Sequence, residues 1–165
     1  MIPKLAILGL LSKKNMHGYE IIKTINTDMT NFCDVKVGSI YFAMKALSKS
    51  GEIEIKETIK GKEEPDKIIY SITKKGREEF EKLLRKAILK TYAGRYPIDI
   101  AIHFKDTLPE KEFRKIISDK LYISERVLKT IQDMNEKEQN SVSKKIFEHQ
   151  ILHQKAEIEW LNNLL

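Results

Sequence analysis

The sequence contains few residues that would cross-link or bend a chain. Cys33 is the only cysteine among 165 residues, so an internal disulfide is excluded and we expect a reducing compartment, the cytoplasm. Glycine and proline number seven and four, which argues against long irregular loops. The apolar run at residues 5–11 is too short to span a membrane. It lacks the flanks of a signal peptide, so we expect a buried helix there.

Catalytic motifs are missing as well. The sequence has no glycine-rich phosphate loop, nucleophile elbow or paired carboxylates, and neither Cys33 nor His103 has a catalytic partner. His149 and His153 are spaced to hold a metal ion, but only Glu157, one turn on, could add a ligand. We therefore expect no enzyme, no cofactor and no metal site, and interpret the two histidines as interface packing.

Charge is abundant, at 33% of residues, and unevenly distributed. Residues 1–92 hold 18 Lys and Arg against 12 Asp and Glu, whereas residues 93–165 hold 12 of each. A basic module joined to a neutral one is typical of a chain that binds polyanion with one half and protein with the other. Chance is the alternative, because the excess is small for a segment of this length.

Residues 37–51 predict a short amphipathic helix with two distinct faces. One face is apolar and another is aromatic and cationic. The apolar residues are Ile40, Ala43, Met44 and Leu47, and the others are Tyr41, Lys45 and Lys49. Gly51 is expected to end the helix in a left-handed conformation. Such a helix is suited to press its polar front against an anion.

The neighbouring segments predict a small domain around this helix. Helices are expected over residues 3–13 and 16–25, strands over 52–60 and 67–73, and a helix capped by Thr73 that ends near residue 92. Ile53, Ile55 and Ile59 should share one half-buried face of the first strand. Three helices, a hairpin and a fourth helix form the order of a winged helix-turn-helix. In that fold one helix enters the DNA major groove and the preceding helix braces it.

Residues 93–165 predict a second, helical region. One or two apolar turns are expected over 98–104. A long helix should begin at a capping box formed by Thr107 and Glu110 and run to about residue 134. A last helix, capped by Ser141, should run to about residue 165.

The first half of the chain resembles the PadR family of bacterial transcriptional regulators over roughly residues 5–85. The resemblance is carried by five blocks in a fixed order: Ala6–Leu11, His17–Ile21, Gly38–Leu47, Gly51 and Tyr70–Arg77. The second half is similar in plan to family members with a long two-helix dimerisation region. The resemblance implies a mainly α fold with a small β-hairpin wing. A winged helix-turn-helix DNA-binding domain would span residues 1–92 and a helical dimerisation domain residues 93–165.

The resemblance also implies a function and a set of site residues. It implies a homodimeric repressor that binds double-stranded DNA at a pseudo-palindromic operator and is released by a small ligand. The expected DNA-binding residues are Tyr19, Lys36, Ser39, Tyr41, Lys45, Lys49, Lys60, Lys62 and Lys67. The expected dimerisation residues are Val142, Ile146, His149, His153, Trp160 and Leu161.

Several residues allow more than one interpretation. Ser39 would either contact phosphate or cap its helix, while His17 and Gly18 are interpreted as structural. Tyr92, Tyr96, Phe104 and Trp160 would line a pocket for an aromatic effector or anchor a core or interface.

The sequence departs from the family pattern at three places. Lys36-Val37 replaces the usual Ser-Pro pair, which removes an N-cap worth about 1 kcal/mol, and Phe42 replaces a proline. The wing tip, residues 61–66, carries three acids that would repel phosphate. Two alternatives to the DNA-binding function are a protein-interaction module on a winged-helix scaffold and a small-ligand carrier.

Overall fold

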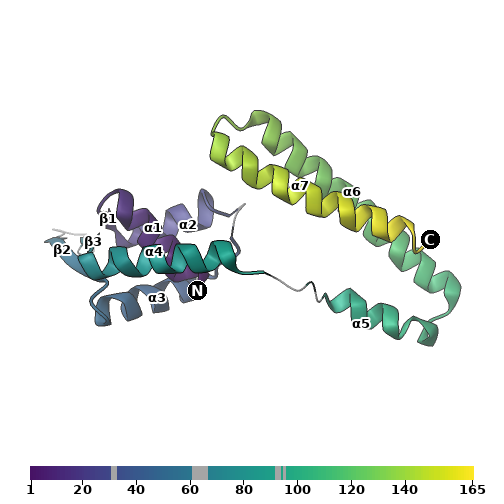
Figure 1. Ribbon diagram of the computed structural model, residues 1–165, viewed down its shortest axis with the longest axis horizontal. Helices are drawn as coiled ribbons and strands as arrows, with labels where there is room; N and C mark the ends of the chain where they lie inside the picture. Colours follow the sequence, from purple (N-terminus) through teal and green to yellow (C-terminus); the bar gives the residue numbers. More distant parts are fainter. Residues whose placement is uncertain (31–32, 61–66, 92–93, 95) are drawn as a thin grey trace. The chain divides into compact units, whose positions relative to one another are not determined.

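The computed structural model describes residues 1–30, 33–60, 67–91, 94 and 96–165. It divides into two compact units, Met1–Tyr92 and Ala93–Leu165 (Figure 1). The first unit contains α1 (Ile2–Lys13), β1 (Met16–His17), α2 (Gly18–Thr27), α3 (Val37–Lys49), β2 (Ile53–Ile59), β3 (Lys67–Ile72) and α4 (Lys74–Leu89). The expected mainly helical fold with a small hairpin is confirmed. No helix within the described ranges is long and apolar enough to cross a membrane.

The core of the first unit is formed by apolar residues of α1, α2 and α3. Ile7, Leu8 and Leu11 of α1 are buried against Ile21 and Ile25 of α2 and the apolar face of α3. Full burial of one such side chain stabilises a fold by about 1.5–3 kcal/mol. Because the apolar face of α3 is buried in the core, its polar face lies at the surface.

A third strand joins the hairpin, which the sequence did not indicate. The sheet has the order β1-β3-β2, with Met16 paired to Tyr70 and His17 to Ile69, all antiparallel. The predicted helical start at residue 16 is therefore wrong, and α2 begins at Gly18. A two-residue strand has no periodicity to detect, and its ladder with β3 is a tertiary interaction. Through β1 the start of α2 is tied to the wing.

A β-bulge changes the face that the end of β2 presents. Ile55 pairs with Tyr70 and Glu57 with Ile69, so Lys56 is the extra residue. Paired residues lie on the same face, so Ile59 lies on the face opposite Ile53 and Ile55. The expectation that these three isoleucines share a half-buried face is wrong. Only Ile53 is buried, and Ile55 and Ile59 are exposed.

The end of α3 is locked by a turn that needs glycine. Gly51 has a φ of 73°, as predicted. Its N–H donates to the carbonyl of Ser48 at 3.1 Å, and the N–H of Glu52 donates to the carbonyl of Leu47 at 2.9 Å. These two bonds form a Schellman motif, which satisfies carbonyls left free at a helix end.

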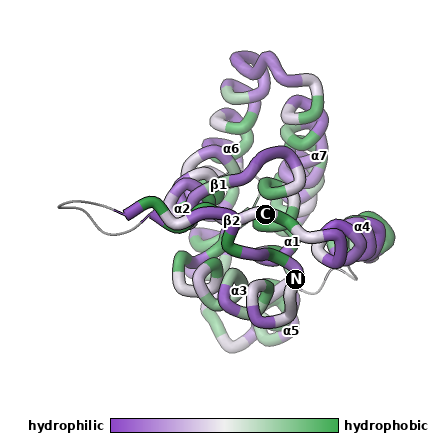
Figure 2. Tube along the Cα trace, turned by 90° about the vertical axis from the view of Figure 1, so that its left-hand side faces the viewer, coloured by the Kyte–Doolittle hydropathy of each residue, from purple (hydrophilic) through white to green (hydrophobic). Residues whose placement is uncertain are grey.

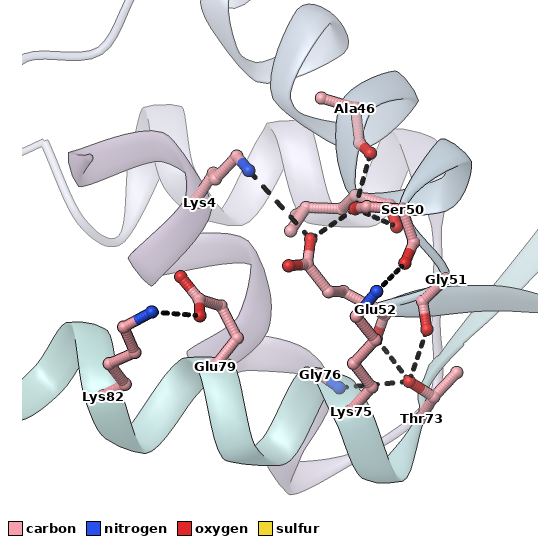
Figure 3. A network of polar contacts seen from close by, with 11 residues as sticks. Lys4, Ala46, Ser50, Gly51, Glu52, Thr73, Lys75, Gly76, Glu79 and Lys82 are labelled. Carbon is pink, nitrogen blue, oxygen red and sulfur yellow. Dashed lines mark hydrogen bonds and ion pairs between the residues drawn. The ribbon is translucent and has the colours of Figure 1, made fainter.

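The same turn anchors the start of α4 (Figure 3). Thr73 caps α4 as predicted, because its Oγ1 accepts from the N–H of Gly76 at 3.1 Å and donates to the carbonyl of Gly51 at 2.7 Å. Lys75 Nζ donates to the carbonyl of Ser50 at 2.7 Å. The end of α3 and the start of α4 are thus joined by polar contacts. The C-terminal end of α4 comes at Leu89, earlier than predicted.

The second unit is built on a helical hairpin. It contains α5 (Pro97–His103), the 3-10 turn η1 (Lys105–Thr107), α6 (Glu110–Lys137) and α7 (Ser141–Asn162). Figure 2 shows hydrophilic and hydrophobic positions alternating along α6 and α7, as expected for amphipathic helices. Phe113, Ile117 and Leu161 form the buried core, and Ile98 and Ile102 of α5 pack against it.

Two predicted caps of the second unit are wrong. Thr107 lies in η1, where its Oγ1 donates to the carbonyl of Phe104 at 2.8 Å, and α6 is preceded by Pro109 instead. Ser141 is the first residue of α7 rather than its cap. Asn140 is the cap, since its Oδ1 accepts from the N–H groups of Val142 and Ser143. Helix α6 thus begins two residues later than the predicted cap allows, and at α7 the cap is the residue directly before the predicted one.

Candidate nucleic-acid interface

Helix α3 presents a ridge of exposed residues opposite its buried face. Ile40, Ala43, Met44 and Leu47 are buried. The outer ridge consists of Gly38, Phe42, Lys45 and Lys49, at spacings of four, three and four residues. The first half of this ridge, Gly38 and Phe42, carries no charge, and the second half, Lys45 and Lys49, is cationic.

An open groove of about 1250 Å³ runs beside α3 and gathers side chains from three elements. Tyr19 comes from the first turn of α2, Tyr41, Lys45 and Lys49 come from α3, and Lys67 comes from the start of β3. These five residues, all named from the sequence as DNA-binding candidates, therefore line one surface. The groove combines cations with aromatic rings that can pack against sugars or bases.

His17 and Gly18 also line this groove, at the junction of β1 and α2. A Cβ on Gly18 would lie 3.4 Å from the Tyr70 ring and 3.5 Å from the Met44 side chain. Both distances are ordinary van der Waals contacts, so the packing of α2 on α3 and β3 does not require glycine here. The structural interpretation of His17 and Gly18 stays a prediction.

The remaining candidates lie elsewhere. Lys36 and Ser39 line a different hollow, at the start of α3, together with the first residues of α1. Lys36 is the N-cap residue of α3, so Ser39 lies inside the first turn and is not the cap. The side chain of Lys36 makes no capping hydrogen bond. Lys60 is exposed after β2, and Lys62 lies outside the described residues, as does the acidic tip at residues 61–66.

Glu20, the residue after Tyr19, forms an ion pair with Lys14. Lys14 Nζ donates to Glu20 Oε1 at 2.6 Å, and this hydrogen bond lowers the pKa of the Glu20 carboxyl. Glu20, in the first turn of α2, is therefore ionised and paired with Lys14, which follows α1. The lysines that line the groove come from α3 and β3.

Two exposed apolar residues on α3 were missed as site candidates. Phe42 is 77% exposed and Val37 is 46% exposed, although both belong to a helix whose apolar face is buried. The signal was present in the sequence, because Phe42 lies about half a turn away from the apolar stripe. An apolar residue on the wrong side of an amphipathic helix is informative about binding.

The second unit contains a mainly apolar pocket of about 710 Å³ between α5, α6 and α7. Tyr96 lines this pocket, and also a smaller hollow beside it that Trp160 lines. Phe104 is exposed and lines neither, and Tyr92 lies outside the described residues. Ser124, which is buried, and the ion pair of Lys120 with Glu157 at 2.9 Å supply polar groups to the pocket.

The expected dimerisation residues differ in what they can offer a partner. Val142, His149 and His153 are exposed on α7, and Ile146 and Trp160 are half-buried. Leu161 is 0% exposed because it packs on Phe113 and Ile117 of its own unit, so its assignment to an interface is wrong. Ile123 of α6 and Leu152 of α7, which were not among the expected dimerisation residues, are exposed apolar residues.

The two histidines of α7 contact each other. The Nε2 atoms of His149 and His153 are 3.0 Å apart. Within the part of the chain that the structure describes, no group of three or more His, Cys, Asp or Glu residues is placed to hold a metal ion.

Comparison with known proteins shows a family similarity in the first unit. The model of the transcriptional regulator PadR-like family matches residues 7–82, which cover the winged helix from α1 to most of α4. Over residues 7–82 the chain is therefore similar to the PadR-like family of transcriptional regulators. The PadR-like region thus contains the whole of the groove and its five candidate residues.

Relatives extend the similarity beyond the PadR-like region. The negative transcriptional regulator PadR of Bacillus subtilis is 28% identical over 175 aligned positions, covering 98% of this chain and 94% of that protein. The crystal structure of Bacillus subtilis PadR in complex with operator DNA has a TM-score of 0.80 at 22% identity, covering 99% and 97% of the two chains. The structure of that protein with p-coumaric acid also gives 0.80, at 20% identity and 99% and 96% coverage. At these identities the solved structures show a common fold.

Proposed function

We propose that the chain is a sequence-specific DNA-binding transcriptional repressor that acts as a homodimer and responds to a small ligand. The observation that supports the proposal most directly is the groove beside α3. It combines Tyr19, Tyr41, Lys45, Lys49 and Lys67 on a PadR-like winged helix. Cations from α3 and β3 suit phosphate, and the outer ridge of α3 suits the major groove. The proposal assigns no catalytic role and includes the cytoplasmic location expected from the sequence.

Two copies would bind one operator. Winged helices related by a two-fold axis read half-sites about 34 Å apart, one turn of DNA, which fits a pseudo-palindrome. The second unit would supply the dimer contacts, because it exposes Ile123 and Val127 on α6 and Val142 and Leu152 on α7. Exposed apolar side chains of this number on a two-helix hairpin favour burial against another protein surface.

We assign the effector to the pocket between α5, α6 and α7. Its volume of about 710 Å³ lies in the range of small-molecule sites. Phe113, Ile117 and Ile102 would pack on an aromatic ring, and the buried Ser124 beside Lys120 and Glu157 would orient a polar end. Bacillus subtilis PadR has been solved with p-coumaric acid, so that compound is the probe of choice.

Effector binding can be measured with the intrinsic fluorescence of Trp160. This residue is the only tryptophan in the chain and lies beside Tyr96 and His153, which both line the pocket. Titration with p-coumaric acid should quench or shift the emission. Ile117→Glu is unsuitable because it would disrupt the core, so Ser124→Ala is the variant to compare. An unchanged spectrum at all concentrations would remove this compound as effector.

DNA binding is tested by mobility shift with the DNA upstream of the chain's own gene at two salt concentrations. We expect a complex at low salt that weakens at high salt, because lysine contacts to phosphate release counterions. Tyr41→Ala should weaken the complex, whereas Lys86→Ala on α4 serves as a control for an exposed residue outside the groove. Absence of any complex at low salt would refute the proposal and favour a protein-interaction module on the same scaffold.

A further inference from the structure

Phe42 is a side chain whose exposure the fold does not explain. At 77% it is more exposed than Tyr41 at 59% or Val37, the other exposed large apolar residues of α3. A phenyl ring in water contributes no burial energy, and phenylalanine is a weaker helix former than alanine, leucine or lysine. Folding of the free chain therefore gives no reason for a phenylalanine at this place.

The position of Phe42 on α3 does suggest a reason. It lies on the outer ridge, with Gly38 one turn before it and Lys45 one turn after it. A Cβ added to Gly38 would meet nothing within 4 Å, so the surface beside the Phe42 ring is low and open. Phe42 also belongs to the first half of the helix, the half that reaches base edges when a recognition helix enters the major groove.

The chemistry of the ring limits what it can read. A phenyl group offers no conventional hydrogen-bond donor or acceptor, so it cannot bind the polar edges of guanine, adenine or cytosine. The apolar group that a base pair displays in the major groove is the C5-methyl of thymine. Lys45 and Lys49, further along the ridge, have the charge to bind phosphate or guanine instead.

We propose that Phe42 is a specificity-determining residue that packs against a thymine C5-methyl in each half-site of the operator. The inference rests on the proposed DNA-binding function and adds one base requirement to it. Burial of one methyl group corresponds to about a fourfold gain in affinity. A dimer that makes the contact in both half-sites would lose about fifteenfold when both methyls are removed.

The test removes the methyl from the DNA and the ring from the protein. The full-length chain selects its tightest duplex from a random pool, and thymines are then replaced by uracil in symmetric pairs. Affinities are measured by fluorescence anisotropy for the natural chain, Phe42→Ala and Tyr41→Ala. Since Phe42 is exposed, Phe42→Ala should keep its circular dichroism spectrum and unfolding midpoint.

The expected result is specific to one pair of positions. The natural chain should lose about fifteenfold at one symmetric thymine pair. Tyr41→Ala should bind more weakly overall but keep the same sensitivity, and Phe42→Ala should bind thymine and uracil duplexes equally. The inference is overturned if uracil has no effect at any pair, or if Phe42→Ala keeps the full loss. Failure to select any duplex would overturn the proposed function together with the inference, so the two failures are distinguishable.

Discussion

Replacement of Gly76 by alanine should sharply lower the stability of the winged-helix unit. Gly76 lies in the first turn of α4, and an added Cβ would stand 2.0 Å from the carbonyl oxygen of Glu52 and 2.8 Å from Cγ1 of Ile72. The same carbonyl oxygen accepts a hydrogen bond from the N–H of Thr73 at 3.1 Å. Neither group is a flexible chain end, so α4 would have to move away. We expect a loss of about 3 kcal/mol in the free energy of unfolding.

The matched control is the same substitution at Gly38. That glycine lies in the first turn of α3, and an added Cβ would meet nothing within 4 Å. Gly38→Ala should leave stability unchanged or raise it by up to about 1 kcal/mol, because alanine is the better helix former. Urea unfolding followed by far-ultraviolet circular dichroism measures both. Equal stability of Gly76→Ala and the natural chain would refute the close packing of α4 on Glu52 and Ile72.

Three further predictions concern a cap, the dimer and the cysteine. Thr73→Val should cost about 1–2 kcal/mol of unfolding free energy in the same urea assay, because the cap to Gly76 is lost; Thr73→Ser should restore most of it, and equal stability of all three would argue against the cap. Val142→Asp combined with Leu152→Asp should halve the mass in light scattering if these exposed residues bind a second copy, and an unchanged mass would place the dimer contact elsewhere. Burial, assisted by the charge of Asp34, raises the pKa of the Cys33 thiol, so less thiolate forms near pH 8. Ellman's reagent should therefore react more slowly with the folded chain than with the urea-unfolded chain. Equal reaction rates would contradict the burial of Cys33.

The sequence was sufficient where a signal is local and repeated. The spacing of Ile40, Met44 and Leu47 defines a face over several turns, and these residues are buried as expected. Thr73 and Gly51 were equally readable, because a cap and a left-handed C′ residue each restrict the residue type strongly. Five DNA-binding candidates could be grouped because the winged-helix order brings α2, α3 and the hairpin together.

What the sequence did not reveal depends on contacts between distant segments. Met16 and His17 form a strand only because β3 is beside them, and the bulge at Lys56 reverses the face of Ile59 through pairing with β3. Leu161 has the same apolar character whether it is bound by its own hairpin or by a partner, and only the packing on Phe113 distinguishes the two. In each of these errors, a contact between segments that are distant in the sequence decides the structure.

The central claim is that α3 binds DNA through its cationic groove. It is tested most directly by the salt dependence of DNA affinity, measured for the natural chain, Lys45→Ala, Lys49→Ala and the control Lys86→Ala. The plot of log affinity against log salt should become shallower by about 1 for each groove lysine that contacts phosphate. The slope of Lys86→Ala should match the natural chain. If the Lys45 and Lys49 variants also keep the natural slope and affinity, α3 is not the DNA-binding element.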